Sequence, residues 1–378
     1  MDATDRALAL ARTPSLHAGH LREHDALLAD PGTLVGLPHR DLRALDLSEA
    51  AADWLAEPDA ALLDRDRAWL ASDSVQLLVR GQPGFPPLLS TISDAPLVLF
   101  VRGRIETLSE PQLAIVGSRK ASTAGRRTAS EFAAGLARAG VGVCSGLALG
   151  IDAASHQGAL SAGRTVAVTA NGLDFIYPPE HRQLAERIVA AGALVSEFPP
   201  GTPPLRDHFP RRNRLISGLS VGTLVIEAAR RSGSLITARL AGEQGRTVFA
   251  VPGSIHHALS EGCHTLIRNG AILVTSVEEV LHDLGLNHLK QWVNPCCTQA
   301  TSGSAKAPEL DKDYEILLDA LGFEPVSIDE LVGRTSLSSH SLASMLLILE
   351  LSGQVSLHDG GRYMRLTSAI EHHGKHCF

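Results

Sequence analysis

The stretch LAIVGSRKASTAGRRTASEF, residues 113–132, decides the fold class. It opens with a short apolar run that ends at Gly117, and a helical pattern starts near Ser122. A continuous apolar run of this length predicts a strand that is covered on both faces. A strand, a short loop and a helix together form the repeating unit of a parallel α/β sheet.

The same unit recurs along the chain. Helical segments separate six further apolar runs, which are VGVCSG, TVAVTA, ALVSEF, TLVIEA, TVFAVPG and AILVTS. Seven such strands with right-handed crossovers predict a doubly wound parallel sheet, the α/β fold class. Before it, the run PLVLFV lies in a proline-rich connector and predicts one more short strand.

The regions outside this core have different patterns. Residues 1–75 contain short amphipathic helices broken at prolines and predict a small helical domain. The core with its connector spans 76–287, and the polar segment 288–309 is typical of a linker. Residues 310–368 resemble a winged helix, and 369–378 form a tail.

The winged-helix prediction rests on three helical patterns followed by two strand patterns around an Asp-Gly turn. The first helix ends at Gly322, and Ser327 with Glu330 has the spacing of a capping box. Residues 310–368 hold 4 Lys/Arg and 9 Asp/Glu, a net charge of −5, and the helix SHSLASMLLILE has no Lys or Arg. We therefore expect this module to contact protein rather than duplex DNA.

Composition limits the class of protein. The 378 residues are 44% hydrophobic, 20% charged and 4% aromatic, which is ordinary for a globular chain. No apolar run reaches the roughly 18 residues of a membrane span, and the N-terminus does not resemble a secretion signal. Five scattered cysteines fit a reducing cytoplasm, and they are Cys144, Cys263, Cys296, Cys297 and Cys377.

The net charge of −7 is unevenly distributed. Residues 1–112 hold 10 basic and 17 acidic residues, and residues 286–378 hold 7 and 11. The middle segment, 113–285, holds 17 basic and 13 acidic residues. A polyanion is therefore expected to bind the middle segment.

The loop after the first strand contains Gly117, Ser118, Arg119 and Lys120. Unpaired N–H groups and the positive dipole end of the following helix favour an anion here. The loop is neither GxGxxG nor GxxxxGK[ST], so dinucleotide binding and P-loop hydrolysis are disfavoured.

Two later strand-helix junctions carry similar groups. One presents an aromatic side chain, an amide and three arginines, which are Phe209, Asn213, Arg211, Arg212 and Arg214. An aromatic ring can stack a base, and guanidinium groups pair with phosphate oxygens. The other is a Ser-Gly-Ser turn at a helix start, made of Ser232, Gly233 and Ser234, with Ser234 as a candidate N-cap.

Two further pairs could be catalytic or structural. Asp152 and His156 lie four residues apart on a helix, which suits a metal or catalysis, but a capping acid and a packed histidine are favoured. Glu227 could act as a general base, but an ion pair with Arg230 is favoured.

Because the carboxyl ends of parallel strands share one edge, all these junctions should lie together. Several anion-binding helix starts in a row suit the phosphates of a single strand of polynucleotide better than one mononucleotide.

These residues resemble the DNA-processing protein A family, also called DprA or Smf. The matching stretches span roughly residues 84–285 and include FPPLLSTISDAPLVLFVRG, AIVGSRKAS, CSGLALGIDAASHQGAL, FIYPPEH, SEFPPGTPPLRDHFPRRNRLISGLS, VIEAARRSGSLITARLAGEQGRTVFAVPG and GCHTLIRNGA. The resemblance implies an extended Rossmann-like core, with a sterile-alpha-motif-like helical domain before it and a winged-helix domain after it. It also implies single-stranded DNA binding, homodimers, and loading of RecA onto incoming DNA in natural transformation.

The resemblance also assigns residues. The family's GSR loop falls on residues 117–119, its FPxRNR segment on residues 209–214 and its SGSL turn on residues 232–235. Leu149 departs from the basic residue of many relatives, which weakens the case for phosphate contact at that junction. The resemblance implies no catalytic residue, cofactor or metal.

Two alternatives stay open at this point. Phosphoribohydrolases related to cytokinin-activating proteins share this kind of core, but their PGGxGTxxE signature is replaced here by SGSL without the following glutamate. A transcription factor would rest on the winged helix alone. The candidates for a dimer surface are apolar side chains near the end of the core, namely Ile267, Val280 and Leu281, although packing inside the core is favoured for most of them.

Overall fold

The protein is described here from a computed structural model. The structure describes residues 1–286, 312–322, 325–335, 337–351, 355–358 and 362–365. The chain forms two compact units, residues 1–294 and 295–378. The predicted linker 288–309 and the tail 369–378 lie outside the described residues.

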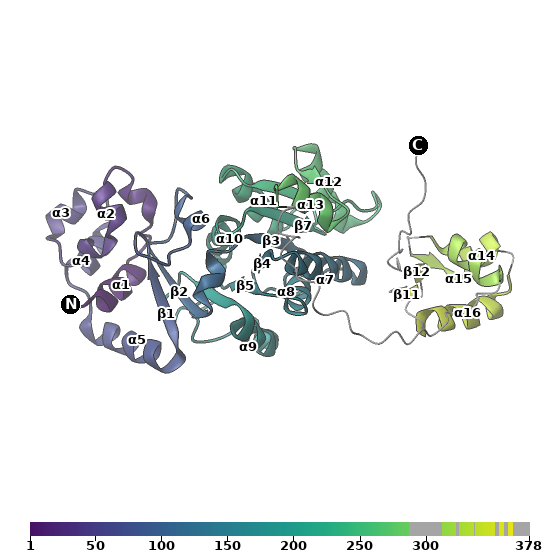
Figure 1. Cartoon of the computed structure of the whole chain (residues 1–378), viewed down its shortest axis with the longest axis horizontal. Helices are drawn as coiled ribbons and strands as arrows, with labels where there is room; N and C mark the ends of the chain where they lie inside the picture. Colours follow the sequence, from purple (N-terminus) through teal and green to yellow (C-terminus); the bar gives the residue numbers. More distant parts are fainter. Residues whose placement is uncertain (287–311, 323–324, 336, 352–354, 359–361, 366–378) are drawn as a thin grey trace. The chain divides into compact units, whose positions relative to one another are not determined.

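A nine-stranded sheet forms the centre of the first unit (Figure 1). Its spatial order is β1-β2-β6-β5-β4-β3-β7-β8-β9. The strands are β1 Val75–Val79, β2 Val98–Gly103, β3 Gln112–Gly117, β4 Gly142–Ser145, β5 Thr165–Val168, β6 Ala193–Ser196, β7 Gly222–Ile226, β8 Thr247–Ala250 and β9 Ile272–Leu273.

The seven predicted strands are confirmed as β3 to β9, and they are all parallel. The run PLVLFV is confirmed as β2, which pairs antiparallel with β6. One strand was not predicted: β1 pairs antiparallel with β2 and extends the sheet at its edge.

Helices cover both faces of this sheet, because alternate strand residues point to opposite sides. In β3, Leu113 and Ile115 join one hydrophobic cluster, whereas Ala114 and Val116 join another. The helices of the core are α6 Pro87–Ser90, α7 Thr123–Arg138, α8 Ile151–Leu160, α9 Arg182–Ala191, α10 His208–Gly218, α11 Ser234–Glu243, α12 Glu261–Arg268 and α13 Val277–Asp283.

The predicted N-terminal helices are present. They are α1 Ala3–Arg12, α2 Asp25–Ala29, α3 His39–Arg43, α4 Glu49–Ala56 and α5 Ala60–Asp73. Their buried leucines share clusters with the sheet; Leu8 and Leu63 pack in one cluster with Phe100 of β2. The boundary at residue 75 between two domains therefore stays a prediction.

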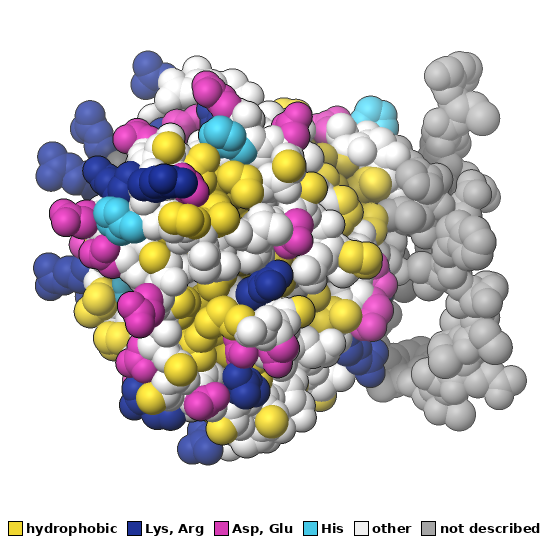
Figure 2. Space-filling view, turned by 90° about the vertical axis from the view of Figure 1, so that its left-hand side faces the viewer, with side chains coloured by type: hydrophobic (Ala, Val, Ile, Leu, Met, Phe, Trp, Pro, Cys, Tyr) yellow, Lys and Arg dark blue, Asp and Glu magenta, His cyan; other side chains and the backbone are white. Residues whose placement is uncertain are grey.

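The surface over these helices carries mixed charge. Figure 2 views the molecule from the end that bears α2, α3 and α4, and shows acidic and basic side chains side by side on this face. In the described part of the chain, no helix combines the length and apolar character that crossing a membrane requires.

The second unit has the predicted pattern of a winged helix (Figure 1). Its elements are α14 Lys312–Leu321, α15 Ile328–Thr335, α16 Ser339–Leu351, β10 Val326–Ser327, β11 Val355–His358 and β12 Arg362–Arg365. Strands β11 and β12 pair antiparallel, as the predicted hairpin requires, and their turn lies outside the described residues. The capping box is confirmed, because Glu330 N donates to Ser327 Oγ and Ser327 N donates to Glu330 Oε2.

The residues expected at a dimer surface lie elsewhere. Val280 and Leu281 of α13 are fully buried in the cluster under α7. Ile267 is half-buried and packs against the core. Val280 and Leu281 are therefore not dimer-surface residues, and the favoured alternative of packing inside the core is confirmed for both, because the amphipathic helix α13 turns these side chains inward.

Candidate nucleic-acid interface

The site lies where the chain reverses its direction across the sheet. Strand β3 has β4 on one side and β7 on the other, so the loops that leave β3 and β7 diverge at their carboxyl ends. Such a switch point is where ligands bind in open α/β sheets. Gly117 lets the ends of β3 and β7 approach each other closely, because a Cβ atom at position 117 would overlap the carbonyl oxygen of Ile226.

A cavity of about 420 Å³ opens at this point. It brings together most of the residues selected from the sequence, and the lining includes Gly117, Ser118, Arg119, Lys120, Phe209, Arg212, Asn213, Ser232, Gly233 and Ser234. Two of the selected residues, Arg211 and Arg214, do not line it.

The start of helix α7 is closed by a side chain of the protein. Ser122 caps the helix by accepting from Gly125 N at 2.9 Å. The Glu227 carboxylate accepts from Ser122 N at 2.8 Å and from the Ser122 hydroxyl. Glu227 therefore binds the start of helix α7 in place of the favoured ion pair with Arg230. Its carboxylate already occupies the position at this helix start where a bound anion was expected.

The positive charge of the first loop comes from its side chains. Arg119 and Lys120 are exposed, and Ser118 Oγ accepts from Lys120 N at 3.1 Å. The Arg119 guanidinium lies over the Phe209 ring, 5.2 Å from its centroid, in a cation–π contact. The loop and α10 are therefore linked at the mouth of the cavity.

A second aromatic ring extends this contact. Tyr177, in the loop after β5, has its ring centroid 6.0 Å from that of Phe209 and is 42% exposed. The sequence analysis quoted its segment, FIYPPEH, but did not select the residue. Its signal was an aromatic residue at a strand-helix junction in a chain with few aromatics.

Arg212 lies beneath the cavity and is only 4% exposed. Its Nη1 donates to the carbonyl oxygen of Gly146 at 2.6 Å and to that of Val168. Burial lowers the pKa of Arg212 to about 10, and the charge of nearby Asp152 opposes this shift. Arg212 thus ties α10 to β4 and β5, and its guanidinium is not free to leave for a phosphate.

Arg211 and Arg214 are directed to another side of α10, where both meet Glu197. Arg214 is buried and pairs with the Glu197 carboxylate and the Asp94 carbonyl oxygen. Arg211 is 41% exposed, with Nε 3.0 Å from Glu197 Oε1 and its guanidinium over the Phe198 ring. The expectation that three neighbouring arginines face one ligand therefore does not fit this geometry.

The Ser-Gly-Ser turn forms the opposite wall of the cavity. Helix α11 begins at Ser234, and the cap position is Gly233, so the prediction of Ser234 as the N-cap was wrong. Ser232 Oγ instead lies 2.7 Å from Ser234 Oγ and accepts from Ser234 N at 3.3 Å. A Cβ atom at Gly233 would meet nothing within 4 Å, so the backbone of this turn faces open space.

The second junction is structural, as favoured from the sequence. Asp152 accepts from Gly146 N at 3.1 Å and from Ala148 N at 3.3 Å, and burial raises its pKa. His156 is fully buried, with Nδ1 2.8 Å from Thr165 Oγ1. Within the described residues, no group of three His, Cys, Asp or Glu side chains could hold a metal ion.

Comparison with protein families identifies the chain. A family model described as DNA recombination-mediator protein A matches residues 76–285, and one described as the DprA winged helix domain matches residues 301–361. The chain belongs to the DNA recombination-mediator protein A family. The resemblance stated from the sequence is thereby confirmed.

Similar proteins agree with this family. The chain is 43% identical to Protein Smf of Escherichia coli K12 over 311 residues, which cover 81% of this chain and 82% of that protein. It is 48% identical to DNA processing protein DprA of Streptococcus pneumoniae R6 over 198 residues, 52% of this chain and 70% of that one.

Two solved structures of the family are also similar. The X-ray structure of DprA from Streptococcus pneumoniae has a TM-score of 0.66 and 36% identity, and covers 75% of this chain and 99% of that chain. DNA processing protein A from Helicobacter pylori, described for its single-stranded DNA binding mode, has a TM-score of 0.51 and 28% identity over 56% of this chain and 95% of that chain. The cavity lies within the part of the chain that the family model matches.

Proposed function

We propose that this protein binds single-stranded DNA in the cavity at the switch point and acts as a recombination mediator. The observation that carries the proposal is the stack of Arg119 on Phe209, with Tyr177 beside it, at the mouth of a cavity. Aromatic rings bind bases of any sequence through their faces, and exposed cations beside them bind the phosphates.

The cavity divides these tasks between its walls. Phe209 and Tyr177 provide surfaces for bases, and Arg119 and Lys120 provide charge for phosphates. In the turn Ser232–Ser234, Ser232 N donates to the Ala229 carbonyl oxygen and Ser234 N to Ser232 Oγ, so the turn offers the N–H of Gly233 and the positive end of a ten-residue helix. Arg212 holds the base of the cavity together through its hydrogen bonds to Gly146 and Val168, and its positive charge makes the electrostatic potential of the cavity more positive.

The wider role follows from the family. The Helicobacter pylori relative is described as binding single-stranded DNA, and we extend this property to the present chain. We propose that the protein protects incoming single strands in the cytoplasm and helps to load RecA onto them during natural transformation. RecA is accordingly a proposed partner, and no cofactor is required.

We further propose that the protein acts without catalysis. The sequence offered two acidic side chains for catalysis near the Ser-Gly-Ser turn. The Glu227 carboxylate is engaged by Ser122, and Asp152, which lines the cavity, accepts from the N–H groups of Gly146 and Ala148. Release of ribose 5-phosphate from AMP should therefore be absent, and its detection would favour the phosphoribohydrolase alternative.

We also propose a homodimer, through a surface that differs from the one considered from the sequence. Strand β9 is the last strand of the sheet, and its Ile272 and Leu273 are 38% and 48% exposed. An apolar edge strand of this kind can pair with a second copy of the chain. Half-buried Ile267 lies just before it in the sequence and could extend the contact.

Fluorescence anisotropy with labelled oligothymidylate tests the binding proposal. Arg119→Ala should weaken binding and lower the slope of log affinity against log salt by about 0.7, the value for one phosphate contact on a single strand. Phe209→Ala should cost about 1–3 kcal/mol through lost stacking. Arg187→Ala, an exposed arginine on α9 that does not line the cavity, is the matched control. Wild-type affinity in both site variants would overturn the proposal.

A further inference from the structure

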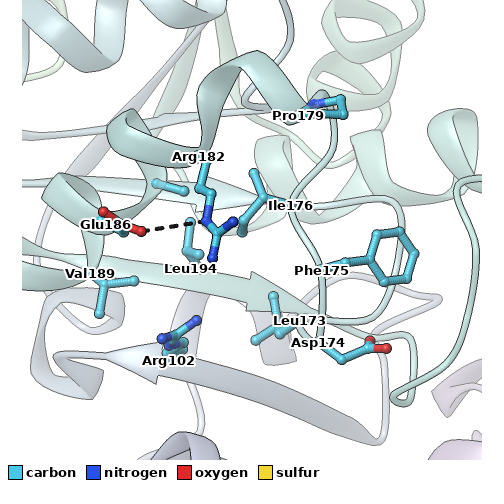
Figure 3. A pocket seen from close by; sticks show the side chains of 11 residues that line it. Arg102, Leu173, Asp174, Phe175, Ile176, Pro179, Arg182, Glu186, Val189 and Leu194 are labelled. Atoms are coloured by element: carbon cyan, nitrogen blue, oxygen red, sulfur yellow. Dashed lines mark ion pairs between the residues drawn. The ribbon is translucent and has the colours of Figure 1, made fainter.

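A second pocket, of about 550 Å³, lies between α9 and β2 (Figure 3). The loop after β5 borders it with residues 173–176 and Pro179. None of the residues selected from the sequence lines this pocket, and it shares no lining residue with the cavity at the switch point.

Two arginines and two carboxylates line this pocket, and both carboxylates are already engaged. Arg182 Nε lies 3.7 Å from Glu186 Oε1, and Asp174 accepts from Gly201 N at 2.9 Å. Arg102 is half-buried, and within the described part of the chain no hydrogen bond or ion pair engages its guanidinium. Figure 3 shows Arg102 entering from β2 and Arg182 from α9, so two guanidinium groups are directed into one pocket. Because Arg182 is paired with Glu186, Arg102 is the cation of this lining that an anion can still pair with, and the charge of Arg182 lies beside it.

The rest of the lining is apolar. Leu173 and Leu194 are buried beneath the pocket, and the Phe175 ring at its border is 37% exposed. A ligand that fits has an anionic group for the arginines and a flat or apolar part for this surface. A nucleotide combines both, and a pocket of this size is in the range of small-ligand sites.

The loop after β5 connects the two sites. Tyr177 contacts Phe209 at the first cavity, whereas Phe175, two residues earlier, borders the second pocket. Two residues of extended chain span no more than about 7 Å. A strand that stacks a base on Phe209 and Tyr177 can therefore continue past Phe175 toward Arg102.

We propose that this second pocket binds a nucleotide, with its phosphate between Arg102 and Arg182 and its base against the apolar wall and Phe175. The nucleotide belongs to the single strand that leaves the first cavity, so this inference rests on the proposed function. Free mononucleotides share the same chemistry, and the experiment separates the two sources.

The test uses the full chain and two oligothymidylates, one of roughly 6 and one of roughly 16 nucleotides, the range of sites for a single binding module. The double variant Arg102→Gln/Arg182→Gln should bind the longer strand about tenfold more weakly, as expected for one lost charge-assisted contact. It should bind the shorter strand as the wild type does. Arg187→Gln on α9 is the control, and thermal unfolding checks that each variant is folded.

The outcomes are separable. Suppose that the wild type binds both strands, that Phe209→Ala binds both more weakly, and that the double variant binds the longer strand as tightly as the wild type does. The second pocket then does not bind the strand, and the proposed function stands. Titration with dTMP completes the test: saturable binding that the double variant loses, without any dependence on strand length, assigns the pocket to free nucleotides. Absence of both effects overturns the nucleotide assignment. A wild type that binds neither strand overturns the proposed function itself.

Discussion

Arg212 Nη1 lies 2.6 Å from the carbonyl oxygen of Gly146, and this hydrogen bond joins helix α10 to the end of strand β4. The same guanidinium occupies the space that a Cβ atom at position 146 would need. Gly146 is thus required by the packing of an arginine, and not by a positive φ or a ligand. The most buried of the arginines selected for DNA binding is a structural anchor of the site.

Arg212→Ala should therefore destabilise the protein. It leaves the carbonyl oxygens of Gly146 and Val168 buried without their donor, which costs about 1–3 kcal/mol for each group. We expect a loss of about 3 kcal/mol in the free energy of unfolding, measured by urea denaturation. Arg119→Ala, at an exposed position, should change it by less than about 0.5 kcal/mol. Equal stability of the two variants would contradict the anchor role.

The two other arginines of α10 should differ from each other. Arg214→Ala leaves the buried Glu197 carboxylate without its buried partner and should cost about 3–5 kcal/mol of stability. Arg211 is 41% exposed and its removal leaves Glu197 paired with Arg214, so Arg211→Ala should cost less than about 1 kcal/mol. Urea denaturation of both variants measures the difference. If Arg211→Ala were the more damaging change, the assignment of Arg214 to the core would be mistaken.

Tyr177 provides a test of the aromatic surface that is independent of Arg119. Tyr177→Ala should weaken oligothymidylate binding by about 1 kcal/mol, the lower end of the range for base stacking. The Tyr177 ring lies 6.0 Å from the Phe209 ring, so Phe209 still offers a stacking surface in this variant. Tyr177→Phe keeps the ring and should bind as the wild type. Leu205→Ala removes another exposed apolar side chain outside the cavity and serves as the control. An equal loss in Tyr177→Ala and Tyr177→Phe would assign the effect to the hydroxyl instead.

The seven parallel strands could be predicted because each is a continuous apolar run that is followed by a helix. Strand β1 was missed for a local reason. It follows α5 directly through Ser74, which has a left-handed φ of 52°, so no glycine or proline marks the end of the helix. The run VQLLV therefore looked like the continuation of the helical region or the start of the connector.

The sequence predicted which residues lie near one another at the candidate site, but not which contacts each of them makes. Parallel strands bring their following loops to one edge, which is why Arg119, Phe209 and Ser232 meet. Successive helical residues point about 100° apart, so the neighbours Arg211 and Arg212 face different surroundings. Which of them is buried depends on β4, β5 and Glu197, which are distant in sequence.

The winged helix should add nothing to duplex binding. Two of its four basic residues are engaged within the unit, because Arg334 donates to the Ala320 carbonyl oxygen and Arg365 to that of Leu318. The segment 310–368 has a net charge of −5, which opposes the release of counterions from DNA. Deleting residues 295–378 should leave the affinity for a duplex oligonucleotide at low salt unchanged or higher. A loss of more than about tenfold would show that the module contacts duplex DNA.

Stability should fall in mild acid because of His156. Thr165 Oγ1 donates to the Val143 carbonyl oxygen, so it accepts from His156 Nδ1, and Nε2 stays unprotonated and without a partner in the described structure. Burial lowers the pKa of His156 from 6.5 to about 3, with the charges of His181 and Arg212 adding to the shift. The unfolded chain therefore binds a proton more readily than the folded chain does.

The direction of this pKa shift determines the pH range over which the protein loses stability. The stabilising contribution of neutral His156 is complete above pH 6.5 and is lost as the pH falls toward 3, by up to about 1.4 kcal/mol per pH unit. Urea denaturation between pH 7 and about 4 should give a steeper decline for the wild type than for His156→Asn, which cannot be protonated. His17, whose pKa burial also lowers, to about 4, is present in both proteins and cancels in the comparison. Parallel declines would mean that His156 binds a proton equally well in the folded and the unfolded protein, because a group couples folding to pH only when its pKa differs between the two states.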